Sequence, residues 1–241
     1  MNTDEQTAVP HFWAVIPAAG IGSRMAAADP KQYLPLCGKT VLEHTLERII
    51  SHPRIVATVL VIAADDGHWP RLADSFAKSS LWIAAGGAER CHSVLNGLRA
   101  LASHAAPRDW VLVHDAARPC VRRKDIDALL EQLMDHPVGG LLGIPVADTM
   151  KRTDREGNII ETVQRKGLWR ALTPQMFRYE QLLQALQAAL DQDKLVTDEA
   201  AAMEISGHMP RMVEGHADNI KITRPQDLAL AELFLRQQEN A

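Results

Sequence analysis

Residues 12–25 read FWAVIPAAGIGSRM, a short apolar run that passes directly into a loop of small residues. A run of this length is typical of a strand buried on both faces of a parallel sheet. Small residues let backbone N–H groups approach an anion, and Arg24 would add a positive charge and a rigid fork of donors. The stretch therefore predicts a strand followed by a phosphate-binding loop. The alternative is a tight strand-to-helix turn that binds nothing.

Further apolar runs alternate along the chain with amphipathic stretches. The runs that predict strands are residues 56–63, 81–85, 110–114 and 138–146. The stretches that predict helices are residues 41–50, 71–78, 90–102 and 125–134. This alternation predicts an α/β fold, a mostly parallel sheet with helices on both faces. Ligands of such sheets bind beyond the carboxyl ends of the strands, so the loops after those ends are the candidate site.

The alternation breaks at residues 148–164, which predict a polar two-stranded ribbon around a turn at Gly157. An isolated hairpin is marginal in water, so we expect the ribbon to pack on its own domain or on a second subunit. The remaining elements are expected as helices at 179–190 and 199–206, a strand at 211–214 and a final helix that starts near Pro225. With no linker or repeat, residues 1–241 predict a single domain that carries an arm at residues 148–170.

Composition narrows the class of protein. The chain has 241 residues, of which 46% are hydrophobic and 23% charged, as expected for a globular protein with a full core. The formal net charge of -4 disfavours a protein that grips long nucleic acid. Cys37, Cys91 and Cys120 show neither disulfide nor zinc spacing, which fits a reducing compartment. No signal peptide or membrane-length apolar run is found, so we expect a cytoplasmic protein that binds no membrane.

Two common nucleotide motifs do not fit. The third glycine of a dinucleotide fingerprint would fall at Met25. The leading glycine of a Walker loop before Gly38-Lys39-Thr40 would fall at Tyr33. Thr40 is instead expected to cap the helix that follows it.

Several polar residues follow predicted strands at their carboxyl ends. Gly87 and Ser93 follow the strand at 81–85, where backbone and hydroxyl groups can meet a nucleotide, although a plain turn is the alternative. Lys31 lies close enough in sequence to reach the phosphates held by the first loop, although a lone lysine is usually a solvated surface residue. Asp115 follows the strand at 110–114 and is expected to hold Mg²⁺ against a triphosphate. The alternative is that Asp115 holds no metal and simply forms an ion pair with Arg118.

The late motifs leave two interpretations open. Thr197 and Asp198 could line a site or merely cap a helix. Asp218 and Lys221 could bind metal or phosphate, or could be ordinary surface charges. His114 shows no zinc spacing and is expected to be a packed residue.

Taken together, these motifs resemble the 2-C-methyl-D-erythritol 4-phosphate cytidylyltransferases of the non-mevalonate isoprenoid pathway. The matching positions run in order along nearly the whole chain: residues 17–25, 30–33, 86–90, 93, 97, 114–119, 145–151, 171–175, 197–200 and 219–225. The departure is Ala88, where some relatives carry an acid; it concerns a peripheral nucleotide contact and not the chemistry.

The resemblance implies a Rossmann-like nucleotidyltransferase fold, dimeric, with the β-hairpin as an arm that crosses to the partner. It implies transfer of a cytidylyl group from CTP to 2-C-methyl-D-erythritol 4-phosphate with release of pyrophosphate, assisted by Mg²⁺. The residues that would hold CTP are Ala18, Ala19, Gly20, Gly22, Gly87 and Ser93, with Asp115 on the metal. The residues that would act in catalysis are Arg24, Lys31, Arg165 and Lys221. The residues that would bind the acceptor are Thr149, Arg165, Thr173, Thr197, Asp218 and Lys221.

Three rival functions are weighed at this point. A cytidylyltransferase that acts on ribitol 5-phosphate would share the first loop and the carboxylate. A nucleotide-binding regulator without turnover is disfavoured, because a protein that only binds gains little from charge aimed at a transition state. An NAD-dependent oxidoreductase is the weakest reading, given Met25.

Overall fold

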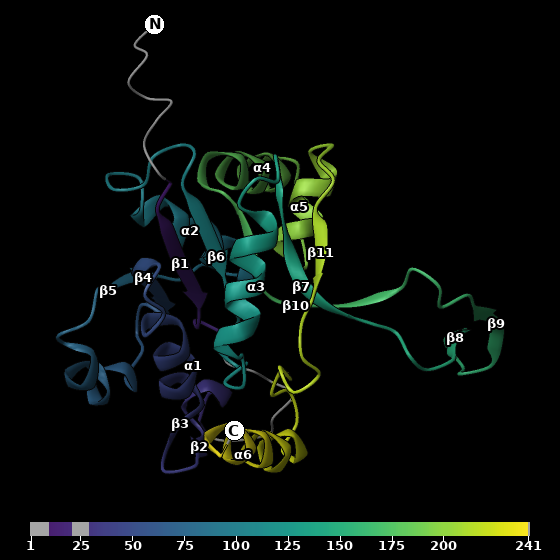
Figure 1. Ribbon diagram of the computed structural model, residues 1–241, viewed down its shortest axis with the longest axis horizontal. Coiled ribbons are helices and arrows are strands. Elements are labelled where there is room, and N and C mark those ends of the chain that lie inside the picture. Colours follow the sequence, from purple (N-terminus) through teal and green to yellow (C-terminus); the bar gives the residue numbers. More distant parts are fainter. Residues whose placement is uncertain (1–9, 21–28, 241) are drawn as a thin grey trace, which may run out of the picture.

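The computed structural model describes residues 10–20 and 29–240, and a seven-stranded sheet forms its centre (Figure 1). The sheet order is β11-β7-β10-β6-β1-β4-β5. The strands are β1 (Phe12–Pro17), β4 (Ile55–Ile62), β5 (Leu81–Ala85), β6 (Trp110–Val113), β7 (Gly139–Pro145), β10 (Trp169–Arg178) and β11 (Arg211–Glu214). Strand β10 runs antiparallel to β6 and β7, and the other neighbours pair in parallel. The predicted mostly parallel sheet is confirmed.

Helices cover both faces of the sheet. Successive side chains of a strand point to opposite faces, so a strand made of apolar residues needs cover on both. Phe12, Ala14 and Ile16 of β1 pack with α1 (Val41–Ile50) and α3 (Arg123–Leu133). Trp13 and Val15 pack on the other face, together with three further helices. Those helices are α2 (Arg90–Ala100), α4 (Tyr179–Asp191) and α5 (Glu199–Ile205).

A smaller apolar cluster attaches the C-terminal helix α6 (Gln226–Glu239) beside the short hairpin that precedes α1 (Figure 1). Ala231 and Leu235 of α6 pack near Leu36 of the short hairpin formed by β2 (Pro35–Leu36) and β3 (Lys39–Thr40). Thr40 caps α1 as predicted, because its side chain accepts from the backbone N–H of Glu43 while the Glu43 side chain accepts from that of Thr40.

The helix predicted at residues 71–78 is wrong. The structure has two short 3₁₀ turns there, η4 (Trp69–Arg71) and η5 (Ala73–Phe76). The Asp66 carboxylate accepts from the N–H groups of His68 and Trp69 at 2.9 and 3.0 Å, and the Ser79 hydroxyl donates to the Phe76 carbonyl at 2.6 Å. Side chains therefore bind backbone groups at both ends of this short segment, which favours turns over a continuous helix.

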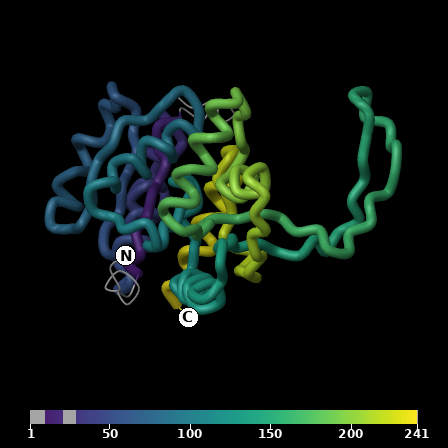
Figure 2. The backbone as a smooth tube through the Cα atoms, turned by 90° about the horizontal axis from the view of Figure 1, so that it is seen from above, coloured from purple at the N-terminus to yellow at the C-terminus, as the bar shows by residue number. Residues whose placement is uncertain are grey.

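The predicted ribbon is present as a protruding arm (Figures 1 and 2). Its strands β8 (Met150–Thr153) and β9 (Ile159–Val163) pair antiparallel around a turn at Gly157, whose φ is 90°. Ile159 and Ile160 are 64% and 62% exposed. The arm extends away from the central sheet, and so exposes apolar side chains that its own body does not cover.

No helix in residues 10–20 and 29–240 is both long and apolar enough to cross a membrane.

Candidate active site

A cavity of about 290 Å³ opens where β1, β5 and β6 end. The loops after these strands meet in it, because the strands run parallel in one part of the sheet. Its lining contains many of the predicted site residues: Ala18, Ala19, Gly20, Lys31, Gly87, Ser93, Asp115 and Lys221. Gly22 and Arg24, which were predicted to act here too, lie outside the described residues.

The first loop continues the edge of β1 into the cavity. The Ala18 N–H donates to the Val61 carbonyl at 2.7 Å, so the backbone stays tied to β4 just past the end of β1. Gln32 then reaches the loop from the turn η3 (Lys31–Tyr33), and its amide nitrogen donates to the carbonyls of Ala18 and Gly20. The loop is therefore anchored by both the sheet and a side chain.

The glycines after β5 allow two loops to come close together. A Cβ at Gly86 would lie 2.3 Å from the Cβ of Ala19, and one at Gly87 would lie 2.4 Å from the Cβ of His92. The Ser93 hydroxyl accepts from the Gly87 N–H at 3.1 Å and donates to the Glu89 carbonyl at 3.3 Å. Ser93 thus lines the cavity and also holds the backbone of Gly87 in place.

Asp115 lies among three cationic side chains. Its carboxylate contacts the Nε of Arg90 at 3.0 Å, the Nε of Arg118 at 3.3 Å and the Nζ of Lys221 at 2.9 Å. Burial raises the pKa of this carboxyl, but the three cations outweigh burial and hold the pKa below its usual range. Asp115 is therefore an ionised carboxylate at neutral pH, and its pairing with Arg118 is part of a larger cluster.

Arg90 connects this cluster to a second buried carboxylate. Its guanidinium binds both carboxylate oxygens of Glu199, at 2.7 and 3.2 Å, and Glu199 is only 1% exposed. Neither residue was predicted as part of the site. Arg90 stood in the motif after Gly86, but its partner follows 109 residues later, so the sequence carried no signal that joins them.

His114 and Thr173 form a buried layer beneath Asp115. The Thr173 hydroxyl accepts from the Asp115 N–H at 3.1 Å and lies 2.9 Å from Nδ1 of His114. Nε2 of His114 is 3.0 Å from the Arg118 carbonyl, and burial lowers the pKa of His114 to about 4. A neutral ring satisfies both contacts by donating from Nε2 and accepting at Nδ1. His114 is a packed residue as predicted, and Thr173 supports the Asp115 backbone without lining the cavity.

The segment that carries Lys221 is clamped on both sides. The Asn219 amide donates to the Thr173 carbonyl at 2.7 Å, and Arg118 donates to the Asn219 carbonyl at 2.8 Å. Asp218 is buried, and it accepts from Arg122 and from Gln238 of α6, each at 2.7 Å. The structure thus places Asp218 in contacts between protein groups, outside the lining of the cavity that Lys221 enters.

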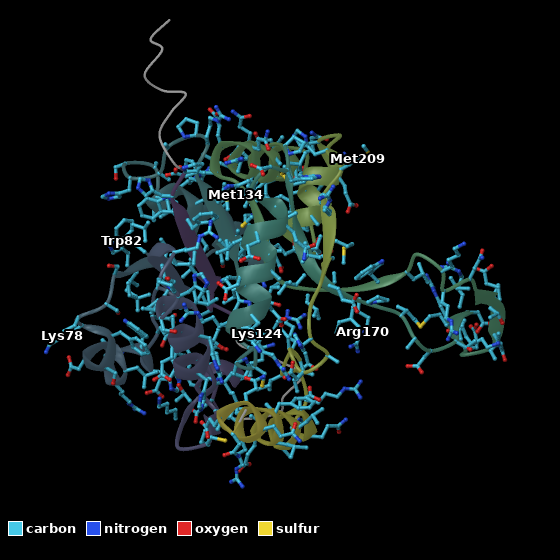
Figure 3. The ribbon with its side chains drawn as sticks, in the orientation of Figure 1. Lys78, Trp82, Lys124, Met134, Arg170 and Met209 are labelled. Carbon is cyan, nitrogen blue, oxygen red and sulfur yellow. The ribbon has the colours of Figure 1, made fainter. Side chains whose placement is uncertain are left out.

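A second cavity of about 370 Å³ shares Lys221 with the first. Arg118 and Arg170 also line it, so three cationic side chains face one space together with Asp227. Figure 3 shows Arg170 where the arm leaves the body. The positive charge that lines this cavity suits an anionic ligand, and such a ligand would lie next to one bound in the first cavity.

The remaining predicted residues lie outside both cavities. Thr149 and Arg165 are exposed on the arm, where the Arg165 guanidinium donates to the Ala147 carbonyl. Thr197 is exposed before α5, and its neighbour Asp198 caps that helix by accepting from the Ala201 N–H at 3.0 Å. Among the described residues, Thr149, Arg165 and Thr197 therefore line neither the cavity that contains Asp115 nor the second cavity.

The donor set at Asp115 fits Mg²⁺ only together with a bound polyphosphate. Among the described residues, no three His, Cys, Asp or Glu side chains are grouped to hold a metal. Mg²⁺ is commonly held by one or two carboxylates plus substrate phosphates and water, so Asp115 alone suffices on the protein side. Its carboxylate is ionised, lines the cavity and faces the loop of small residues.

Comparison with known proteins gives a consistent result. The family model described as 2-C-methyl-D-erythritol 4-phosphate cytidylyltransferase matches residues 12–237. A protein of that name from Hahella chejuensis is 54% identical over 226 residues, which cover 94% of this chain and 93% of the relative. One from Pseudomonas aeruginosa is 55% identical over 221 residues, covering 91% and 94% of the two chains.

Solved structures agree with the sequence relatives. A crystal structure of 4-diphosphocytidyl-2C-methyl-D-erythritol synthase superposes with a TM-score of 0.82 at 38% identity, covering 94% of this chain and 99% of that one. The 2-C-methyl-D-erythritol 4-phosphate cytidylyltransferase from Thermus thermophilus gives a TM-score of 0.77 at 30% identity, with coverage of 94% and 99%.

Proposed function

The chain belongs to the 2-C-methyl-D-erythritol 4-phosphate cytidylyltransferase family, and from that premise we propose that the cavity at the ends of β1, β5 and β6 is its active site. The enzyme transfers a cytidylyl group from CTP to 2-C-methyl-D-erythritol 4-phosphate, in isoprenoid biosynthesis. The products are 4-diphosphocytidyl-2-C-methyl-D-erythritol and pyrophosphate. The observation that carries the site assignment is the meeting of the first loop, Lys31, Asp115 and Lys221 in one cavity.

The reaction makes one phosphorus–oxygen bond and breaks another. A phosphate oxygen of the acceptor attacks the α-phosphorus of CTP, and the bond to the β-phosphate's bridging oxygen breaks to release pyrophosphate. A phosphate monoester is largely dianionic at pH 7, so the nucleophile needs no general base. The main difficulty is to bring two polyanions together, and fixed cations reduce this repulsion and stabilise the charge that develops on the phosphoryl oxygens.

We assign the groups around the cavity accordingly. The backbone at Ala18, Ala19 and Gly20, with Gly87 and Ser93, would hold the nucleotide. Lys31 would stabilise charge on the phosphoryl groups, with Arg24 as an expected second cation. Asp115 would hold Mg²⁺, which when bound would neutralise phosphate oxygens. Lys221 would orient the acceptor, because it lines both cavities.

The acceptor is proposed to enter through the second cavity. Arg118, Arg170 and Lys221 supply positive charge there, next to the cavity that would hold the α-phosphate. A phosphate at this position would lie beside CTP, and such proximity can contribute several kcal/mol to the lowering of the barrier.

A pyrophosphate-release assay tests the proposed function. Purified enzyme is given CTP and Mg²⁺ with 2-C-methyl-D-erythritol 4-phosphate, with ribitol 5-phosphate, or with no acceptor. We expect rapid release with the first acceptor alone. Faster release with ribitol 5-phosphate would favour the rival acceptor, and CTP binding without any release would favour a regulator.

Replacement of Arg165 by alanine is expected to raise KM for the acceptor with a smaller effect on kcat. An arginine fork that holds a phosphate contributes mainly binding and orientation. The measurement is steady-state kinetics with each substrate varied in turn, and Arg155→Ala, in the turn of the same arm, is the control. An unchanged KM for the acceptor would remove Arg165 from the acceptor site.

We further propose that residues 1–241 act as one nucleotidyltransferase domain and that the arm, residues 148–170, crosses to a second copy in a homodimer. What supports this is an arm that leaves its own body, exposes Ile159 and Ile160, and carries Arg165 outside both cavities of its own chain. A partner's arm would then bring Thr149 and Arg165 to the acceptor.

Mixing two impaired variants tests the crossing arm. A mixed dimer pairs one Lys31→Ala subunit with one Arg165→Ala subunit. If the arms cross, one of its two sites combines an intact Lys31 with an intact Arg165. After random exchange of equal amounts, about a quarter of all sites should therefore be intact. The mixture is assayed at low acceptor concentration after subunit exchange, with each variant alone as the control. No gain over the average of the two variants would contradict the crossing arm, and so would a monomer in sedimentation.

The expected compartment is the cytoplasm. The free thiols of Cys37, Cys91 and Cys120 support a reducing environment. The net charge of -4 supports small-molecule partners over nucleic acid.

A further inference from the structure

Gln32 is a polar side chain that is almost fully buried beside the cavity, with 3% of its surface exposed. Its amide nitrogen donates to the Ala18 carbonyl at 2.6 Å and to the Gly20 carbonyl at 3.1 Å. Both carbonyls belong to the loop after β1, and Gln32 itself lines the cavity. Both hydrogens of the amide NH₂ are thus directed at one loop.

These two hydrogen bonds constrain the direction of the loop's peptide groups. In a trans peptide the C=O of one residue and the N–H of the next point in opposite directions. Because Gln32 binds the Ala18 carbonyl, the N–H of Ala19 must point away from Gln32. A peptide flip at this position would break a buried hydrogen bond and leave the Gln32 donor facing another donor, which is unfavourable.

Gln32 is itself held in a fixed place. It belongs to the turn η3, where the neighbouring Tyr33 is buried, donates from its hydroxyl to Asp66 at 2.7 Å and stacks on His68 with ring centroids 4.8 Å apart. The other neighbour is Lys31, which lines the cavity. Gln32 therefore links the loop after β1 to the turn that presents Lys31.

We propose that Gln32 is a positioning residue for CTP: its amide fixes the Ala18–Gly20 backbone and Lys31 relative to each other, so that both can contact the triphosphate. This inference rests on the proposed function, because it assigns the nucleotide to the same cavity. Gln32 acts through the loop and the lysine, and it needs no contact with the reacting atoms.

Two variants of Gln32 separate hydrogen bonding from packing. Gln32→Met keeps the length and burial but removes both donors, and we expect KM for CTP to rise about tenfold and kcat to fall about tenfold. KM for the acceptor should stay within about twofold, because the acceptor cations lie on other segments. Gln32→Glu replaces the donating amide with a carboxylate whose oxygens face two carbonyl oxygens. At pH 8, its KM for CTP should therefore rise more, and its kcat fall more, than those of Gln32→Met.

The pH profile of Gln32→Glu gives a readout that packing alone would not produce. Burial and the facing carbonyls would raise the pKa of the new carboxyl, and its protonated form can donate one hydrogen bond. Its KM for CTP, relative to wild type at the same pH, should therefore fall from pH 8 to pH 6. Gln32→Met should show no such recovery.

Tyr179→Phe is the matched control, because it also removes a buried hydrogen bond to a carbonyl, that of Leu98, on the face covered by α2 and α4. It should leave both KM values unchanged. If wild type releases no pyrophosphate, the proposed function fails. If wild type is active and Gln32→Met keeps its KM for CTP, the positioning role is overturned. An equal rise in both KM values, or no recovery of Gln32→Glu at low pH, would also overturn it.

Discussion

Lys31→Ala should lower kcat by roughly 10²-fold or more, as expected when one fixed electrostatic donor is lost from a site that stabilises developing charge. Lys31 lines the cavity on the turn η3, next to the residue that ties the loop after β1. When the α-phosphorus is attacked, charge accumulates on its oxygens and on the leaving pyrophosphate. A missing ammonium group therefore raises the energy of the transition state more than that of bound CTP.

The measurement is single-turnover cytidylyl transfer at saturating CTP and acceptor, with the melting temperature recorded in parallel. Lys39→Ala is the matched control, because Lys39 is an exposed lysine that pairs with Glu47 at 2.6 Å and lines none of the cavities described here. The control should turn over like wild type. A Lys31→Ala enzyme with near wild-type turnover would remove Lys31 from the chemistry.

Asp115→Asn should have a still larger effect, with kcat lowered by roughly 10³-fold, because it removes the proposed metal ligand and unbalances the surrounding cations. Arg90, Arg118 and Lys221 all contact the carboxylate that would be lost. We also expect a lower melting temperature, since these partly buried cations would then repel one another with less compensation.

The assay varies the Mg²⁺ concentration at saturating substrates, and circular dichroism confirms that the variant is folded. Asp127→Asn, on α3, is the control, because it removes a carboxylate that contacts His52 at 3.0 Å outside the cavity. A folded Asp115→Asn enzyme with wild-type turnover and an unchanged dependence on Mg²⁺ would show that Asp115 is not the metal ligand.

The fold was largely predictable where each strand has an uninterrupted apolar run. Strands β1 and β5 have the predicted bounds because short apolar runs mark them, and α1 has them because Thr40 caps its start. Strand β11 also has the predicted bounds. Strand β10 was missed because Trp169–Arg178 mixes charged residues with a proline, which argues against a central strand. Its inner residues are buried between β6 and β7, a pairing that depends on distant parts of the chain.

The candidate site was predictable where a single residue lies just beyond the end of a predicted strand. Asp115 and Gly87 lie two residues beyond the ends of β6 and β5, so a parallel sheet brings them to the same edge. The ion pair of Arg90 with Glu199 was missed because helix α5 brings Glu199 to α2 only after folding. The sequence pattern also could not show that Asp218 contacts Arg122 and Gln238, since α6 supplies one of these partners.

A crystal structure of the enzyme with CTP and Mg²⁺ tests most directly whether the cavity at β1, β5 and β6 holds the reacting phosphates. We predict the triphosphate against Ala18–Gly20 and Lys31, with the ion bound to Asp115. A nucleotide bound elsewhere would contradict the account, for example in the cavity of about 340 Å³ that Arg108 and Arg178 line.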